Sequence, residues 1–345
     1  MESSFDLNEK KAFCPLCNAN CKVTLVEYRS EDSLKHLSIN RGQKEYEFLK
    51  HQIIQNWNGD KCDFVECENC HFNFAVPFIG GSSELYSVYY NSPDPDPQLN
   101  WEHKMATDLI VEKYGENALT HLKLLEFGPG DGGFIKNVVQ KGFDPKNIFG
   151  IESSQSCINA LNQFGVSCLS SDLSSIDLEP IKNSVDVIVM FQVLEHLSAL
   201  EQTFKFINEI SKDNASLFIA VPNNYVRRYY ELKGIFIDVP PIHISRWSQE
   251  NFKMLGKRFG WKLNKFQYEK NSFTKSAYNF IYNKGFNKDY NKIKSKVKSK
   301  LIRWPILGVK ISYLFFKNLI SILNIKLSMN GTAELAQFEK ITSAK

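Results

Sequence analysis

Two features of exported and membrane-spanning proteins are missing from this 345-residue sequence. No uninterrupted apolar run approaches the roughly 18 residues that indicate a transmembrane helix. Residues 1–11 are polar and mixed in charge, and they lack the apolar stretch of a secretory signal. We therefore expect a cytoplasmic protein.

A strong excess of one charge is missing as well. The 42 basic and 38 acidic residues leave a net charge of +4, which is too small to indicate a nucleic-acid partner by itself. Basic residues are concentrated at 284–303, and an apolar stretch follows at 304–325. We interpret these segments first as a helical lid, second as a contact with the inner membrane surface through residues 284–325, and last as an RNA-binding surface.

Cysteine is more plentiful. Four of the eight cysteines form two C-x-x-C pairs, Cys14 with Cys17 and Cys67 with Cys70. In a reducing compartment such pairs indicate metal binding before disulfides. Two residues between ligands let both sulfurs reach one tetrahedral ion, so two pairs complete a closed four-cysteine site. We predict a structural Zn²⁺ that stabilises a segment with little core of its own.

The distance between the two pairs is long for a zinc ribbon. Cys21, Cys62 and His71 are therefore substitute candidates for one of the four ligands. Cys157 and Cys168 have no partners at metal-ligand spacing, and we expect them to be ordinary buried thiols.

Strand-like and helix-like segments alternate in the middle of the chain. The apolar, strand-like runs lie at 122–127, 147–151, 166–169, 185–191 and 216–221. Helical spacing between most of them predicts an α/β fold with a Rossmann-like doubly wound sheet. An alternating pattern near the end of the chain predicts an antiparallel last strand that returns to the sheet after a helical insertion.

This pattern divides the chain into five parts. They are a zinc-ribbon-like module at 1–80, a connector and leading helix at 81–120, the ligand-binding α/β domain at 121–270, a basic amphipathic helical insertion at 271–328, and the last strand and tail at 329–345.

A glycine-rich turn, Gly128-Pro129-Gly130-Asp131-Gly132, separates the first strand-like run from a helix-like segment. Glycines allow a tight turn and a close approach of the backbone to a ligand at a helix N-terminus. Glu126 would repel the pyrophosphate of a dinucleotide but suits a cationic ligand. This acid therefore argues against a nicotinamide-dependent dehydrogenase.

Two further acids end neighbouring strand-like runs. Glu152 follows the glycine turn by about 20 residues, where an acid can accept hydrogen bonds from ribose hydroxyls. Asp172 follows the third run. Ligands of open α/β sheets bind at the carboxyl ends of the strands, which is where both acids are expected.

These motifs together resemble those of class I S-adenosylmethionine-dependent methyltransferases. The resemblance covers residues 122–270 and includes the segments Ser171–Leu173 and Phe191–Leu197. It implies S-adenosylmethionine as cofactor and methyl transfer as the reaction. The cofactor-binding residues that it implies are Glu126, Phe127, Gly128, Gly130, Glu152, Ser153, Asp172, Leu173, Phe191 and Gln192.

By the same resemblance, the glycine turn would hold the amino-acid end of the cofactor and Glu152 its ribose. Asp172 would face the adenine amine, and Phe191–Gln192 would border the methyl-donor end. Residues 64–90 resemble the leader of bacterial methyltransferases with an N-terminal zinc ribbon, many of them enzymes of sugar and polysaccharide biosynthesis. The long segment 22–61 departs from that pattern.

Two histidines are candidates for a general base, which an acceptor that loses a proton requires. His243 follows Pro240–Pro241, and the family often has a histidine here, in the loop that covers the acceptor. His196 is the second candidate, with capping of a helix start as its alternative role. Arg246 suits an anionic acceptor, with an ordinary surface arginine as the alternative.

We therefore expect methyl transfer to a small-molecule or glycan-type acceptor, which could be lipid-linked, on oxygen before carbon or nitrogen. The second hypothesis is an rRNA methyltransferase, since some of these enzymes join an N-terminal zinc site to this fold. The third is a non-catalytic docking protein that retains the fold. Nucleic acid is the least favoured partner, and no oligomeric state is predicted.

Overall fold

The computed structural model describes residues 12–21, 23–38, 41–90, 99–232, 238–270, 293, 299–317 and 330–341. The chain forms two compact units. The first contains residues 1–222, 238–267 and 333–345, and the second contains residues 223–237 and 268–332.

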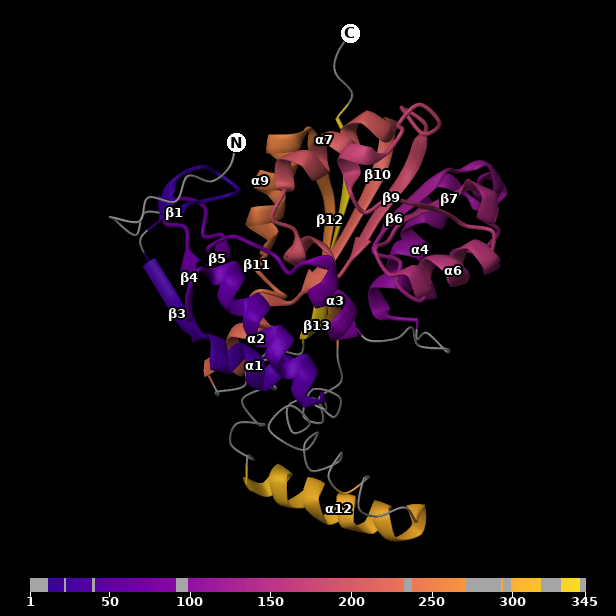
Figure 1. Ribbon diagram of the computed structural model, residues 1–345. Helices are drawn as coiled ribbons and strands as arrows, with labels where there is room; N and C mark the ends of the chain where they lie inside the picture. The colour runs from indigo at the N-terminus through magenta and orange to yellow at the C-terminus, as the bar shows by residue number, and fades with distance from the viewer. Residues whose placement is uncertain are drawn as a thin grey trace. The chain divides into compact units, whose positions relative to one another are not determined.

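A seven-stranded sheet organises the first unit (Figure 1). Its strand order is β12 (Trp261–Lys270), β13 (Asn330–Lys340), β10 (Ser211–Pro222), β9 (Val185–Phe191), β6 (Leu124–Phe127), β7 (Ile148–Ile151) and β8 (Ser167–Leu169). The five strands from β10 to β8 pair in parallel, and β13 pairs antiparallel to β10. The predicted doubly wound sheet and its antiparallel last strand are therefore confirmed.

The chain leaves β6 toward β7 and β8 on one side and returns to β9 and β10 on the other. The strand order thus reverses beside β6. Open α/β sheets bind ligands at such a switch point, beyond the carboxyl ends of the strands. The glycine turn directly follows β6 and lies at this point.

Strand β9 is the centre of the core, and its side chains alternate between two apolar layers. Val187 and Val189 pack with helices α4 (Trp101–Tyr114) and α5 (Gly133–Gln140). Ile188 and Met190 pack on the opposite layer with α7 (Leu200–Ile210) and α9 (Gln249–Phe259). Burial on both faces explains why this run is almost continuously apolar.

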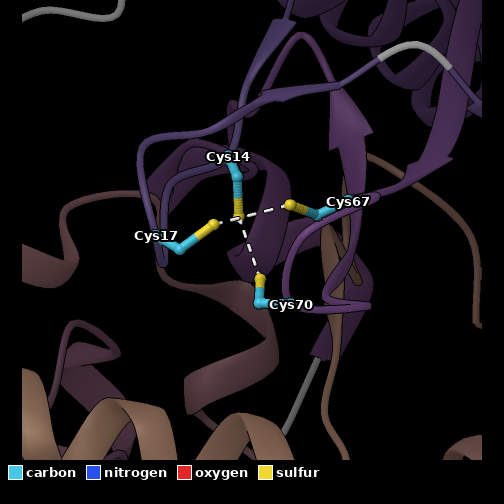
Figure 2. Close-up of side chains that lie close together, drawn as sticks. All are labelled: Cys14, Cys17, Cys67 and Cys70. Carbon is cyan, nitrogen blue, oxygen red and sulfur yellow. Dashed lines mark hydrogen bonds between the residues drawn. The ribbon is translucent and has the colours of Figure 1, made fainter.

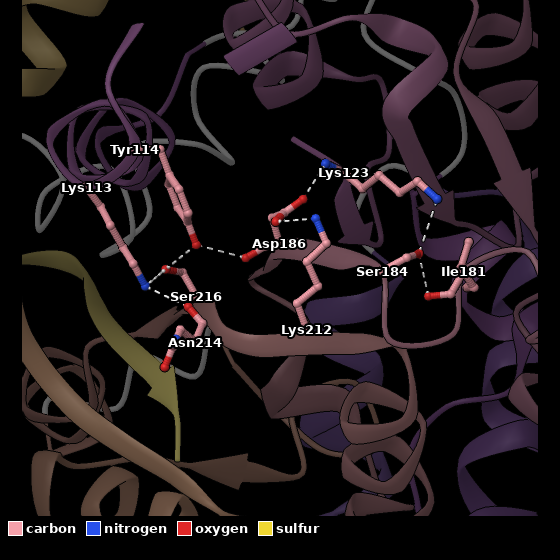
Figure 3. Close-up of polar contacts among 9 residues, drawn as sticks. All are labelled: Lys113, Tyr114, Lys123, Ile181, Ser184, Asp186, Lys212, Asn214 and Ser216. Atoms are coloured by element: carbon pink, nitrogen blue, oxygen red, sulfur yellow. Dashed lines mark hydrogen bonds and ion pairs between the residues drawn. The ribbon is translucent and has the colours of Figure 1, made fainter. Parts of the chain in front are cut away.

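Polar contacts close the amino-terminal edge of the same strands (Figure 3). The Asp186 carboxylate accepts from the Lys123 backbone N–H at 2.9 Å and pairs with Lys212 Nζ at 2.8 Å. The Tyr114 hydroxyl donates to the Asp186 carbonyl at 3.1 Å. These contacts occupy the edge opposite the glycine turn.

A second sheet contains strands from both halves of the chain. Its order is β11 (Ser245–Arg246), β5 (Asn73–Val76), β4 (Lys61–Glu66) and β3 (Val23–Arg29). Strand β11 follows the fifth parallel strand in sequence, yet it pairs antiparallel with β5. The Phe72 and Trp247 ring centroids are 4.6 Å apart. The cysteine-rich segment and the α/β domain therefore share one core.

The segment between the cysteine pairs forms helices. Helices α1 (Ser30–Leu37) and α2 (Gln43–Trp57) connect β3 to β4, and α3 (Ser83–Tyr90) follows β5. Leu37, Leu49 and Ile53 are fully buried, so these helices have an apolar face inside the unit.

The second unit contains α8 (Asn224–Leu232) and α12 (Lys300–Lys317). The expected helical insertion is confirmed over α12, whereas residues 284–292 and 294–298 of the basic stretch lie outside the described residues. No helix in the described part of the chain is long and apolar enough to span a membrane.

Candidate functional site

The glycine turn after β6 adopts a backbone that favours glycine. Gly128, Gly130 and Gly132 have φ of 62°, 53° and 78°, a region that other residues visit rarely. A Cβ on Gly128 would lie 2.8 Å from Val193 Cγ2, so this position also needs glycine for space. A Cβ on Gly130 would meet no atom within 4 Å among the described residues. The surroundings of Gly130 are therefore open enough for a ligand to approach the backbone.

Glu126, at the third position of β6, is 3% exposed. Its Oε2 has no hydrogen-bond partner among the described residues. Burial raises the pKa of Glu126 well above its usual value, and the negative charges of Glu152 and Asp131 add to the effect. A buried carboxyl in this state gains from a cationic partner. The ammonium of an amino-acid ligand is such a partner.

Glu152 links the end of β7 to the glycine turn. Its Oε2 accepts from the Gly130 N–H at 3.0 Å, while Oε1 accepts from the Ser153 and Ser154 N–H groups at 2.7 and 2.8 Å. The carboxylate therefore fixes the turn as well as presenting oxygen atoms at the sheet edge. Ser153 is exposed beside it.

Asp172 lies at the end of the next βα connection. Its Oδ1 accepts from the Ser174 N–H at 3.1 Å and from the Ser174 hydroxyl at 2.6 Å, which caps the turn Leu173–Ser175. These bonds lower the pKa of Asp172. The carboxylate is exposed and ionised, and its role toward adenine stays a prediction.

Gln192 directly follows β9 and has a φ of 57°. Its Nε2 donates to Glu102 Oε1 of α4 at 3.2 Å. The neighbouring Phe191 ring packs against His103 and Phe134, with centroids 4.9 and 4.8 Å apart. Burial lowers the pKa of His103 to about 4, so this ring is neutral. The sequence did not predict a role for Glu102 and His103. The residue pattern of helix α4 does not show which of its side chains contact the end of β9.

The two candidate histidines lie side by side, although His196 follows β9 in sequence and His243 follows β10. His196 ends the short helix η4 (Leu194–His196), and its ring centroid is 4.6 Å from that of His243. His196 Nδ1 is 2.7 Å from the Ile242 carbonyl oxygen, and His243 Nδ1 is 3.3 Å from Asp238 Oδ1. Burial lowers the pKa of His196. The structure thus brings both predicted histidines together.

The alternative role of His196 as a helix cap does not hold. The residue that precedes α7 is Ala199, and no side chain caps that helix start. His196 instead contacts the loop at 238–244 through the Ile242 carbonyl. That loop leads to α9, whose first turn is capped by Ser248: its hydroxyl accepts from the Asn251 N–H at 3.3 Å.

Residues 101–265, just under half of the chain, match the protein family described as "Methyltransferase domain". They form a class I S-adenosylmethionine-dependent methyltransferase domain. The expected enzyme class is thereby confirmed. A comparison with curated protein sequences found no match.

Solved structures resemble the chain at low identity. A protein of Galdieria sulphuraria, provisionally named a sarcosine dimethylglycine methyltransferase, is 13% identical at a TM-score of 0.44, over 75% of this chain and 98% of its own. An S-adenosylmethionine-dependent methyltransferase of Archaeoglobus fulgidus is 15% identical at 0.41, over 69% and 94%. A phosphoethanolamine N-methyltransferase of Haemonchus contortus is 14% identical at 0.40, over 69% and 53%. These likenesses carry no information on the acceptor.

The four cysteines of the two C-x-x-C pairs point toward one another (Figure 2). Their sulfur atoms all lie within 4.8 Å of one another, with 3.6 Å between Cys14 and Cys70 and 3.5 Å between Cys17 and Cys67. Sulfurs bound tetrahedrally at about 2.3 Å from zinc are about 3.8 Å apart. The donor set and its spacing therefore fit one zinc ion.

Both cysteine turns have the same backbone. The Asn18 and His71 N–H groups donate to the Cys14 and Cys67 carbonyls, each at 2.8 Å, and both donor residues have positive φ. The hydrogen bond between Cys14 and Cys70 lowers the pKa of Cys70 to about 5 and raises the pKa of Cys14, so the Cys14 thiol donates to a Cys70 thiolate, the form that metals bind.

The three substitute candidates are not members of this four-sulfur cluster, although Cys21 borders it and contacts Cys67. The sulfurs of Cys21 and Cys62 contact the carbonyls of Ala19 and Asp63, and the exposed His71 pairs with Glu66 at 3.3 Å. The long spacing that suggested them arises because α1 and α2 separate β3 from β4.

Cys157 is buried and Cys168 partly buried, both outside the cluster.

Arg246 is not a surface residue. It is 7% exposed, its guanidinium lies over the Phe64 ring at 4.3 Å, and Nη2 donates to the Tyr28 hydroxyl at 3.0 Å. The sequence context of Arg246 could not reveal this, since both partners belong to the distant segment that forms β3 and β4.

Proposed function

We propose that this protein transfers a methyl group from S-adenosylmethionine to an oxygen of a small-molecule or glycan-type acceptor. One observation carries the proposal. The His196–His243 pair follows β9 at the same sheet edge as the glycine turn, next to the position expected for the methyl-donor end. A histidine lone pair at this place suits an acceptor that must lose a proton.

The residues around the glycine turn fit the cofactor. Glu126 offers a buried carboxyl whose Oε2 has no hydrogen-bond partner among the described residues, and the methionine ammonium would supply its countercharge. The open space at Gly130 leaves room for close backbone approach. Glu152 would accept hydrogen bonds from the ribose, and Phe191 and Gln192 would border the sulfonium. Bound S-adenosylmethionine supplies an activated methyl group.

His243 is the proposed base. Its Nδ1 lies 3.3 Å from Asp238 Oδ1, and a carboxylate beside Nδ1 favours the proton on that nitrogen and the lone pair on Nε2. That lone pair can take the acceptor's proton, a contribution of about 10²–10⁴-fold in rate. The side chain is 16% exposed, which limits water around the reacting groups while leaving them accessible.

Zinc bound by the four cysteines would be structural. All four positions of a tetrahedral ion would be filled, which leaves none for a substrate. Asn251 Nδ2 of α9 donates to the Cys70 carbonyl at 2.8 Å, and Arg258 Nη1 donates to the Pro15 and Leu16 carbonyls at 2.6 and 2.9 Å. The ion would therefore rigidify a segment that supports the methyltransferase domain directly.

Contact with an anionic membrane surface through α12 is part of the proposal and would suit a lipid-linked acceptor. Four apolar or aromatic side chains of α12 are more than half exposed: Trp304, Val309, Tyr313 and Phe316. The spacing of the last three places them on one helix face. Lys310 Nζ lies 5.8 Å from the Tyr313 ring, so a cation borders this face.

Transfer of a labelled methyl group tests the proposal. The purified protein would be incubated with methyl-labelled S-adenosylmethionine and, in separate reactions, free oligosaccharides, lipid-linked oligosaccharides or ribosomal RNA. We expect label in a saccharide fraction, in an ether that resists mild base. Label in RNA would support the rRNA hypothesis instead, and binding of cofactor without any transfer would favour the docking hypothesis.

A further inference from the structure

A second group of metal-binding side chains lies beside the proposed methyl-donor end. Glu195, His196 and His243 each offer one ligand atom, and these atoms lie within 4.8 Å of one another. His196 Nε2 is 4.0 Å from Glu195 Oε1. The three side chains are 1%, 11% and 16% exposed, in that order, so the group is largely shielded but reachable.

Both histidines are held in the orientation that metal ligands need. His196 Nδ1 is 2.7 Å from the Ile242 carbonyl, which can only accept, so Nδ1 carries the proton and Nε2 the lone pair. The Asp238 carboxylate, 3.3 Å from His243 Nδ1, favours the same tautomer in His243. A metal-bound histidine usually donates its other N–H to a carbonyl or a carboxylate. One histidine of this group has the first kind of partner and the other has the second.

The backbone holds the three residues together without a metal. The Ile244 N–H donates to the Glu195 carbonyl at 2.9 Å, which ties the His243 loop to η4. The Tyr86 ring of α3 packs edge-on against the His196 ring at 5.4 Å. These contacts limit the motion of the ligands, as a metal site requires.

We propose that Glu195, His196 and His243 bind a first-row divalent metal ion, such as Mn²⁺, that is distinct from the cysteine-bound zinc. Two imidazoles and one carboxylate form a donor set that leaves coordination positions open. Ligand atoms bound at about 2.0–2.2 Å lie roughly 3–3.5 Å apart. The side chains therefore close by on the order of 1 Å on binding.

The role of this ion rests on the proposed function. At an open position it binds an oxygen of the acceptor and lowers the pKa of that hydroxyl, as metals do for bound water. The proton then leaves to solvent. With the ion bound, the His243 Nε2 lone pair is a metal ligand, so the ion replaces His243 as the group that activates the acceptor, and the rest of the proposed function is unchanged. An acceptor with two adjacent oxygens, such as a vicinal diol, would occupy two open positions.

Titration with Mn²⁺ tests the site. A brief treatment with a chelator would strip an open three-ligand site while the closed four-cysteine site keeps its zinc, which elemental analysis verifies. Free Mn²⁺ would then be followed by electron paramagnetic resonance. We expect one bound Mn²⁺ per chain, lost in His243→Ala and in Glu195→Gln. Asp238→Asn should weaken binding by about 10–100-fold, because it removes the partner of a ligand.

His121→Ala is the matched control, since His121 is an exposed histidine outside the group; it should bind Mn²⁺ like the wild type. Binding of S-adenosylhomocysteine, measured on every variant, reports intact folding. Wild-type protein that binds S-adenosylhomocysteine but no Mn²⁺ would overturn the metal site while leaving the proposed function standing. Mn²⁺ binding that survives both His243→Ala and Glu195→Gln would overturn it as well.

Discussion

The Gly130 N–H donates to Glu152 Oε2 at 3.0 Å, across 22 residues of sequence. Two residues that were predicted separately to bind the cofactor therefore also hold each other. This bond fixes the glycine turn at the end of β6 against the end of β7. The proposed cofactor site is thus ordered before a ligand arrives, which lowers the entropic cost of binding.

Replacing Glu152 by alanine should weaken binding of S-adenosylhomocysteine by about 1–3 kcal/mol, because ribose hydrogen bonds are lost and the turn loses its tether. Calorimetric titration measures the change. Glu152→Gln, which keeps one acceptor oxygen, should lose less. Glu179→Ala is the control, since the Glu179 side chain is 79% exposed and pairs only weakly with Lys182. Equal affinities of Glu152→Ala and wild type would contradict the assignment.

Glu126 should make the ligand-free protein less stable as the pH rises. Burial raises its pKa in the folded state above 4.5, so between 4.5 and that higher pKa the folded state binds more protons than the unfolded state. Stability from this group is therefore complete below 4.5 and is lost as the pH rises through the folded-state pKa. Glu126→Gln keeps the shape but cannot ionise. The difference in melting temperature, Glu126→Gln minus wild type, should increase as the pH rises. A difference that stays constant with pH would disprove the prediction.

Cys67→Ser should abolish zinc binding. The protein is expected to contain one zinc per chain, which elemental analysis of unchelated protein measures, and the variant none. Because the cysteine turns share the core of the methyltransferase domain, the variant should also melt at a lower temperature. Cys168→Ser lies outside the cluster and should keep its zinc. Wild-type protein free of metal would refute the zinc site.

Helix α12 should bind anionic vesicles. Val309→Ser with Phe316→Ser removes two side chains that are 74% and 72% exposed, so vesicle cosedimentation should fall. Ile54→Ser removes an apolar side chain that is 38% exposed on α2 and serves as the control. Wild-type protein that sediments equally with neutral and anionic vesicles, or not at all, would exclude this contact.

Much of the fold could be predicted from local pattern. The apolar runs of β6, β9 and β10 reflect burial on both faces, and the glycine turn reflects the required positive φ. Strand β11 could not be predicted in the same way. It has two residues, and it exists because the 245–246 backbone pairs with β5, some 170 residues earlier.

The candidate site could also be predicted only in part. His243 and His196 could be named because prolines and a strand end mark their surroundings, and the cysteine ligands because their spacing is fixed by zinc geometry. Asp238, Tyr86 and Glu102 could not, since each acts through a contact with a distant element. Arg246 is the opposite case. The sequence suggested that it could bind an anionic acceptor, whereas its guanidinium is buried against Phe64 and Tyr28.

Calorimetric titration of the purified protein with S-adenosylhomocysteine, with NADH in parallel, tests the central claim most directly. The arrangement of Glu126, Gly130 and Glu152 predicts that S-adenosylhomocysteine binds at one site per chain and that NADH does not bind. Binding of NADH instead, or no binding of S-adenosylhomocysteine to folded, zinc-containing protein, would contradict the account.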